Sequence, residues 1–160
     1  MSVNKYRLHL LLIPEDDANR QIANGFMLEN RLDSRAIQIL PPPGGWKKTI
    51  DFFIENHIEP IQKYAERRVM LLVDFDNDAN RFHMISGHIP TAIRNRVFVL
   101  GCLSEPEQLR NNTRMSYEMI GKILAEDCVD GTDRLWSHPM LRSNRREIVR
   151  FKPTFRALLR

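Results

Sequence analysis

The sequence predicts an α/β domain built on an open, mainly parallel β-sheet with helices on both faces. Three observations support this prediction. Four short apolar runs have the length and composition of buried strands, segments with helical spacing separate them, and no hairpin signal joins any pair. Consecutive parallel strands joined through helices form right-handed units, and a series of such units gives a sheet that is covered on both sides. We expect the 160 residues to form a single domain, 1–160.

The first strand is expected at residues 6–13, a nearly continuous apolar run that ends at Pro14. Such a run is typical of a strand buried on both faces. The apolar residues that follow recur at helical spacing: Ala18, Ile22 and Phe26. Asp16 or Asp17 can cap this helix, so an acidic turn that contains Glu15 links the first strand to the first helix.

The second strand is expected at residues 35–40 and ends at three prolines and two glycines, residues 41–45. Proline cannot pair in a sheet and glycine allows a sharp change of direction, so we expect a loop at the same end of the sheet as Glu15. Residues 50–61 then place apolar side chains on one helical face, and Pro60 is expected to kink or split that helix.

The third and fourth strands are expected at residues 68–73 and 96–103. After the fourth strand, Ser104 is expected to cap a helix and Pro106 suits its first turn. A further helix is expected at residues 117–128.

The charge of the chain is unevenly distributed. The net charge is +4, but residues 142–160 contain seven arginine and lysine residues against one glutamate, so this segment carries +6 and residues 1–141 carry −2. A basic segment of this kind is suited to contact nucleic-acid phosphates, because arginine neutralises them and releases counterions. A solvated basic face or a docking segment for a partner protein explains the same pattern equally well.

The N-terminal residues lack the pattern of a secretion signal, and no apolar run approaches the ~20 residues of a membrane span, so we expect a cytoplasmic protein without membrane contact. Cys102 and Cys128 lie far apart, without further cysteine or histidine at zinc-ligand spacing, which indicates two reduced thiols.

Carboxylates follow three of the four expected strands. The residues concerned are Glu15 and Asp16 after the first strand, Asp74, Asp76 and Asp78 after the third, and Glu105 after the fourth. The carboxyl ends of parallel strands meet at one edge of a sheet, where ligands bind in open α/β folds. Close carboxylates repel one another unless a cation neutralises them, and hard oxygen ligands suit Mg²⁺ or Mn²⁺. The sequence therefore predicts a divalent-metal site at this edge.

A glutamate after the first strand combined with Asp74-Phe75-Asp76 after the third resembles the TOPRIM catalytic domain of topoisomerases, primases and nucleases of the overcoming-lysogenization-defect type. The resemblance covers residues 6–110 and is nearest to small stand-alone TOPRIM-like proteins of bacterial defence and accessory loci. Residues 111–160 would be a helical and basic C-terminal extension. The chain differs from the family in having Asp16, where the family usually has glycine.

The resemblance implies magnesium-dependent phosphodiester chemistry, in the manner of a nuclease. Glu15 would be the catalytic acid/base or a metal ligand, and Asp74 and Asp76 would bind Mg²⁺, with Asp78 as a further ligand. Glu105 or Glu107 would supply the acidic residue that such proteins often carry after the fourth strand.

Basic residues in two segments are candidates for binding the nucleic-acid backbone. They are Lys47 and Lys48 after the glycine loop, and Arg142, Arg145, Arg146 and Arg150 in the C-terminal segment. For the two lysines, exposure at the start of a helix is a sufficient alternative explanation.

Two further functions fit the pattern. In a phospho-acceptor domain of the response-regulator type, Asp74 would accept the phosphoryl group and Glu15 and Asp16 would hold Mg²⁺, although Ser104 is a poor substitute for the hydroxyl residue expected there, and a Lys-Pro after a fifth strand is lacking. A noncatalytic scaffold that binds a partner protein is also compatible with the sequence. The sequence leaves the type of nucleic acid and the oligomeric state open.

Overall fold

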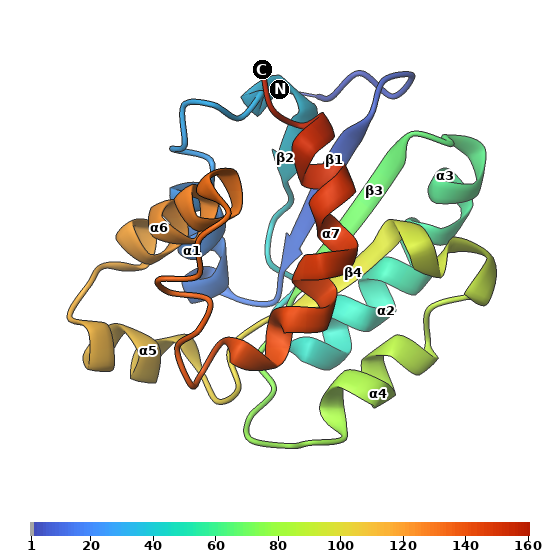
Figure 1. The fold of residues 1–160 in the computed structure, drawn as a ribbon. Coiled ribbons are helices and arrows are strands. Elements are labelled where there is room, and N and C mark those ends of the chain that lie inside the picture. The colour runs from blue at the N-terminus through green and yellow to red at the C-terminus, as the bar shows by residue number, and fades with distance from the viewer. Residues whose placement is uncertain (1) are drawn as a thin grey trace.

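The structure, a computed structural model, describes residues 2–160. Its centre is a four-stranded sheet in the order β2-β1-β3-β4, and every neighbouring pair of strands is parallel. Helices pack on both faces of this sheet (Figure 1). The predicted open parallel α/β architecture is therefore confirmed.

The strands lie close to their expected positions. They are β1 (His9–Pro14), β2 (Ile37–Ile39), β3 (Arg67–Leu72) and β4 (Val97–Leu100). The second and fourth are shorter than expected: the 3-10 turn η1 (Ser34–Ala36) occupies the expected start of β2, whereas β4, which follows the 3-10 turn η2 (Thr91–Arg96) directly, ends three residues earlier than expected. In the register of the sheet, Leu12 of β1 lies beside Ile39 of β2 and Met70 of β3.

Two groups of helices cover the sheet. On one face lie α2 (Trp46–Asn56), α3 (Ile58–Lys63) and α4 (Arg81–Gly87), and on the other lie α1 (Asp17–Phe26), α6 (Tyr117–Asp130) and α7 (Arg145–Ala157) (Figure 1). Successive strand residues point to opposite faces, so Leu11 and Ile13 join one core and Leu10 and Leu12 the other. Both faces are buried, which explains why the strands are continuous apolar runs.

Two local expectations need correction. The helix expected at residues 50–61 is divided at His57, and Pro60 lies inside α3, within the first turn where its missing N–H costs little. The N-cap of α5 (Pro106–Thr113) is Glu105 rather than Ser104. Ser104 Oγ instead donates a hydrogen bond to the Gln108 side chain at 2.9 Å.

Helices α1 and α6 approach each other at two glycines. A Cβ atom added to Gly25 would lie 1.9 Å from the carbonyl oxygen of Glu118, and one added to Gly121 would lie 1.9 Å from that of Ile22. Any side chain at either position would collide with the backbone of the neighbouring helix. The two glycines thus set the distance between these helices.

Side chains of the C-terminal segment cover the free edge of β4. Asn144 accepts a hydrogen bond from the N–H of Gly101 and donates one to its carbonyl, at 3.0 and 2.8 Å. Glu147, which is buried, accepts from the N–H of Val99 at 2.9 Å. Buried backbone groups need such partners, so these side chains provide at the edge what a fifth strand would provide.

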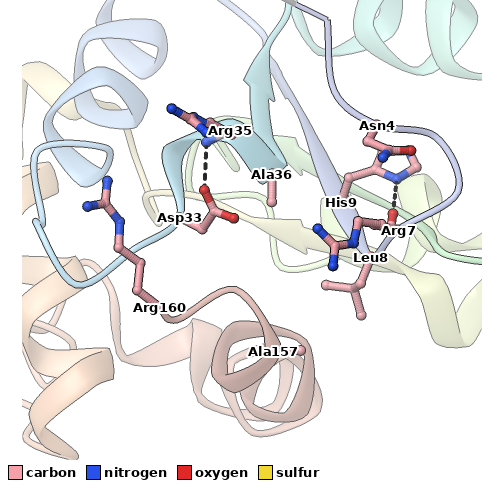
Figure 2. A pocket seen from close by; sticks show the side chains of 9 residues that line it. All are labelled: Asn4, Arg7, Leu8, His9, Asp33, Arg35, Ala36, Ala157 and Arg160. Carbon is pink, nitrogen blue, oxygen red and sulfur yellow. Dashed lines mark hydrogen bonds between the residues drawn. The ribbon is translucent and has the colours of Figure 1, made fainter.

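The amino ends of the strands border a pocket of about 800 Å³, between the segment before β1, the turn before β2 and the end of α7 (Figure 2). The metal site predicted from the sequence would lie at the opposite edge of the sheet. Across residues 2–160, every helix is too short or too polar to cross a lipid bilayer.

Candidate metal centre

Glu15 and Asp16 lie where β1 passes into α1. The N–H of Glu15 donates to the carbonyl of Leu72 at 2.8 Å, so Glu15 extends the pairing between β1 and β3 by one residue. Asp16 is the N-cap of α1 and accepts a hydrogen bond from the N–H of Asn19 at 2.9 Å. Sheet pairing therefore fixes Glu15, and helix capping fixes Asp16.

Asp74 reaches the same place from β3. Its N–H donates to the Glu15 carboxylate at 3.0 Å, while the Asn19 side-chain amide donates to Asp16 at 2.9 Å and to Asp74 at 3.0 Å. Asn19, which is buried, therefore joins two of the three carboxyl groups. The sequence-based prediction did not include Asn19, because its contact with Asp74 is a long-range one.

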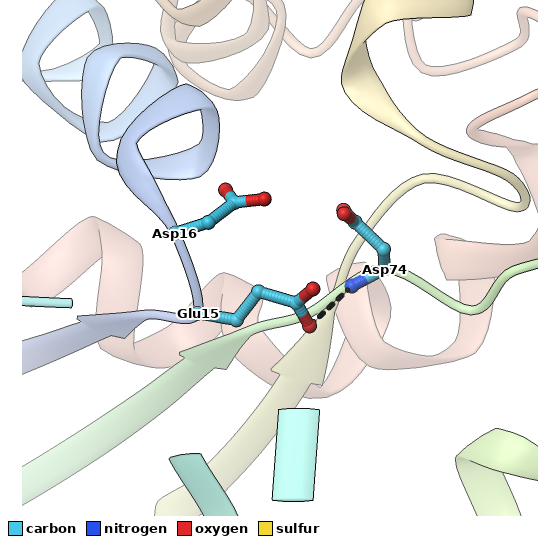
Figure 3. A group of neighbouring side chains, drawn as sticks. All are labelled: Glu15, Asp16 and Asp74. Carbon is cyan, nitrogen blue, oxygen red and sulfur yellow. Dashed lines mark hydrogen bonds between the residues drawn. The ribbon is translucent and has the colours of Figure 1, made fainter. Parts of the chain in front are cut away.

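The three carboxyl groups converge (Figure 3). One oxygen from each of Glu15, Asp16 and Asp74 lies within 4.8 Å of the other two. Glu15 and Asp74 are only 7% and 6% exposed, and Asp16 is partly exposed, so the group is open to solvent on the side of Asp16. The arrangement offers several hard oxygen donors to one small cation.

Burial makes ionisation of this group costly. Burial raises the pKa of Glu15 to about 7, against the hydrogen bond from the N–H of Asp74, and the charge of Asp16 raises it further. Burial likewise raises the pKa of Asp74 to about 8, opposed by the hydrogen bond from Asn19 and reinforced by the charge of Glu15. A bound divalent cation would favour the ionised forms and remove this cost.

The other carboxylates of the predicted site are engaged elsewhere. Asp76 has a left-handed backbone conformation with a φ of 48° and forms an ion pair with Arg81 at 2.7 Å. Asp78 accepts a hydrogen bond from the N–H of Asn80 at 2.9 Å. Glu105 is exposed at the start of α5. Of the carboxylates predicted at this edge, the converging group in the described part of the chain thus contains Glu15, Asp16 and Asp74.

The glycine loop lies at the same edge of the sheet, as expected. The N–H groups of Gly44 and Gly45 donate to the backbone carbonyl of Glu15 at 2.9 and 3.0 Å. Both glycines have a positive φ, 96° and 113°, which other residues rarely adopt. The loop therefore fixes the start of α2 next to Glu15.

Arg81 links the start of α2 to the exit of β3. Its guanidinium lies 4.4 Å from the centre of the Trp46 ring and donates to the carbonyl of Asp74 at 3.2 Å as well as to Asp76. Its Nε is buried and has no hydrogen-bond partner among residues 2–160. Arg81 is thus a cation that its contacts with Trp46, Asp74 and Asp76 hold beside the three converging carboxylates.

The basic residues expected to bind nucleic acid divide into two sets. Lys47, Lys48, Arg142, Arg145 and Arg146 are exposed. The three arginines lie close in sequence to Asn144, which is hydrogen-bonded to Gly101 just past the carboxyl end of β4. They therefore lie toward the same edge of the sheet as the three converging carboxylates.

Arg150 differs from these residues. It pairs with Glu147 at 2.6 Å, donates to the carbonyls of Arg94 and Val97, and lies over the Phe98 ring. The N–H groups of the Arg150 guanidinium thus bind to groups at the β4 edge of the sheet.

Comparisons of the chain with protein-family models, with curated proteins and with solved structures give no match.

Proposed function

We propose that Glu15, Asp16 and Asp74 bind a divalent cation, Mg²⁺ or Mn²⁺, and that the protein uses it to cleave phosphodiester bonds in nucleic acid, in the manner of a TOPRIM-like nuclease. The observation that supports the proposal is the convergence of three carboxyl oxygens within 4.8 Å at the carboxyl edge of a parallel sheet. Open α/β sheets bind their ligands at this edge. Carboxylate oxygens are the donors that both cations prefer.

The partial exposure of Asp16 leaves room for further ligands on the cation. Mg²⁺ usually retains several positions for water or substrate phosphate when protein carboxylates bind it. A cation in this place would polarise a phosphodiester and stabilise the charge that develops on its oxygens. For this role the cation must be accessible to substrate from at least one side. Asp16 is less buried than Glu15 and Asp74, so the accessible side of the site is the one next to Asp16.

The side chains in and around the three converging carboxylates have complementary roles in this proposal. Glu15 would hold the cation together with Asp16 and Asp74, and the bound cation would keep its carboxylate ionised. Arg81 presents a guanidinium beside Asp74, where it would neutralise charge on a phosphate. The exposed cations at the same edge would hold the nucleic-acid backbone. They are Lys47, Lys48, Arg142, Arg145 and Arg146.

A phospho-acceptor domain is the second candidate. Asp74 follows the third strand and faces two carboxylates that follow the first, which is the arrangement such a domain needs. The burial of Asp74, at 6% exposure, argues against in-line attack by its carboxylate on the phosphorus of a phosphodonor. Incubation with acetyl phosphate and Mg²⁺, followed by intact-protein mass spectrometry, would detect an aspartyl phosphate and favour this function.

The proposed metal site is tested by titrating Mn²⁺ and Mg²⁺ calorimetrically into the wild-type protein and two variants. Asp74→Asn removes a carboxylate from the converging group, whereas Asp78→Asn makes the same change four residues later, and its side chain can still accept from Asn80. We expect Asp74→Asn to weaken binding at least about tenfold and Asp78→Asn to change it by less than about twofold. Equal affinities for all three proteins would refute the metal site.

The proposed chemistry is tested on the same samples with supercoiled plasmid and single-stranded DNA and RNA. Cleavage that requires the cation, is lost in Asp74→Asn and persists in Asp78→Asn would support a nuclease. Metal binding without cleavage of any of these substrates would leave the metal site standing and count against phosphodiester hydrolysis by the isolated chain.

A further inference from the structure

The pocket at the amino edge of the sheet is lined by basic side chains that the proposed metal chemistry does not use. It measures about 800 Å³, and Arg7, Arg35 and Arg160 enter its lining from three separate segments (Figure 2). We propose that this pocket binds a ligand that carries two or more phosphate groups, with the guanidinium groups of these arginines as the phosphate contacts.

Buried His9 fixes the main chain that carries Arg7. Arg67 Nε donates to His9 Nε2 at 3.0 Å, so Nε2 is an acceptor and the ring proton is on Nδ1. Nδ1 then donates that proton to the backbone carbonyl of Arg7 at 2.7 Å. The ring is fully buried, so the position from which the Arg7 side chain extends is rigidly held.

Hydrogen bonds also hold the other two arginines. The Asp33 carboxylate accepts from the N–H of Arg35 at 3.1 Å and thereby caps η1. Arg160 donates its N–H to the carbonyl of Arg31 at 2.9 Å and its Nε to that of Leu32 at 3.2 Å. The main chain at all three positions is therefore fixed before any ligand arrives, which lowers the entropic cost of binding.

The three pocket arginines form no ion pair with an Asp or Glu side chain of the described residues. Within residues 2–160, no Asp or Glu carboxylate lies within ion-pair distance of Arg7, Arg35 or Arg160. Asp33 is the one side-chain carboxylate in the lining, and it accepts a hydrogen bond from the backbone N–H of Arg35, so the lining holds three guanidinium groups against one carboxylate. A guanidinium group is suited to bidentate contact with phosphate oxygens.

The size of the cavity indicates the class of ligand. Pockets for small molecules usually measure about 300–1,000 Å³, and this one lies in the upper part of that range. A nucleoside polyphosphate fits this volume, whereas a single phosphate ion would fill only a small part of it. A short stretch of nucleic-acid backbone offers the same phosphate chemistry through the open side.

The test is a calorimetric titration of ATP, inorganic phosphate and a short single-stranded oligonucleotide into the full chain. EDTA is present throughout, so that no phosphate can bind through a cation at the carboxyl edge. The variant Arg7→Ala with Arg35→Ala removes two pocket charges, and Lys122→Ala with Lys152→Ala removes two charges that lie outside the pocket and outside the converging carboxylates. Circular dichroism and the melting temperature check that each variant is folded, and single Arg7→Gln and Arg35→Gln variants replace the double variant if it unfolds.

We expect ATP to bind the wild-type protein, to bind at least about tenfold more weakly to the arginine variant, and to bind the lysine variant unchanged. Inorganic phosphate is expected to bind more weakly than ATP. If ATP does not bind but the oligonucleotide does, with the same dependence on the two arginines, the site stands and its phosphates come from a nucleic-acid backbone. Failure of every phosphate probe to bind, or affinities that the arginine substitutions leave unchanged, would overturn the proposal, whatever the outcome of the metal titrations.

Discussion

At the scale of single residues, Glu15 and Asp74 are two carboxyl groups held close together in a largely buried place. The N–H of Asp74 and the amide of Asn19 each supply one hydrogen bond, but two donors do not compensate for burial beside another carboxylate. The folded protein therefore binds protons here that the unfolded chain has already released. This difference makes the stability of the metal-free protein depend on pH.

The direction of that dependence follows from the two raised pKa values. Between about pH 4, where both groups ionise in the unfolded chain, and about pH 8, the folded state holds more protons at this pair, so the contribution of the pair to stability falls as the pH rises. Asp74→Asn removes one of these ionisations, so we expect it to stabilise the metal-free protein in EDTA more at pH 8 than at pH 5.5, by a difference on the order of 3 kcal/mol.

Thermal unfolding at both pH values, with and without Mg²⁺, is the measurement. Added Mg²⁺ should raise the melting temperature of the wild-type protein at pH 8 and leave Asp74→Asn unchanged. Asp78→Asn serves as the control and should follow the wild-type protein. A stabilisation by Asp74→Asn that is the same at pH 8 and at pH 5.5 would contradict the raised pKa of Asp74.

The sequence predicted part of this site, because strand ends are visible in a sequence and side-chain directions are not. Glu15 and Asp74 each follow an apolar strand directly, and parallel pairing alone brings them together. Asp76 lies only two residues further, but its left-handed backbone conformation directs its side chain to Arg81. Asn19 remained unrecognised because its contact with Asp74 joins residues 55 positions apart.

At the scale of elements, the contact between α1 and α6 depends on the absence of side chains at Gly25 and Gly121. Close packing leaves no space for a methyl group at a distance of 1.9 Å from a carbonyl oxygen. We expect Gly121→Ala to destabilise the protein by about 1–3 kcal/mol, because the helices must move apart.

Gly87 provides the matched control for that substitution. It lies in α4, and a Cβ atom there would meet no other atom within 4 Å. Gly87→Ala should therefore stabilise the protein slightly, by about 0.4–1 kcal/mol. Urea unfolding of both variants gives the comparison, and a destabilisation of equal size at both positions would contradict the close helix contact.

The positions of the elements were more predictable than their boundaries. Buried parallel strands are continuous apolar runs, so all four were located and the sheet type is confirmed. The break between α2 and α3 falls at His57 rather than at Pro60, because proline is compatible with the first turn of a helix. The cover of the β4 edge was not predicted, since it requires Asn144 and Glu147 to reach residues more than 40 positions earlier.

At the scale of the whole molecule, basic and acidic side chains share one edge of the sheet. The three converging carboxylates lie largely buried at the ends of β1 and β3. Arg145 and Arg146 lie exposed at the start of α7. Nucleic acid that contacts the arginines would displace counterions, so its affinity should fall as salt increases.

We expect Arg145→Ala with Arg146→Ala to weaken nucleic-acid binding and to reduce the slope of log K against log[salt] by roughly 1.4–1.8, the loss of two phosphate contacts. The matched control is Lys152→Ala with Arg156→Ala, which removes two exposed charges further along the same helix. Fluorescence anisotropy over a range of salt concentrations measures both slopes. Equal slopes for the two double variants would exclude the start of α7 from the interface.

The side chains that cover β4 also protect the sheet from association with other chains. A chain that ended after α6 would contain all four strands, yet Val99 and Gly101 would have no partners on their outer side. One face of the sheet would also lack Phe151 and Phe155. Such a species offers an open strand to any neighbouring chain. Residues 144–155 therefore protect the protein from aggregation, because they supply both the closed edge and part of the covered face.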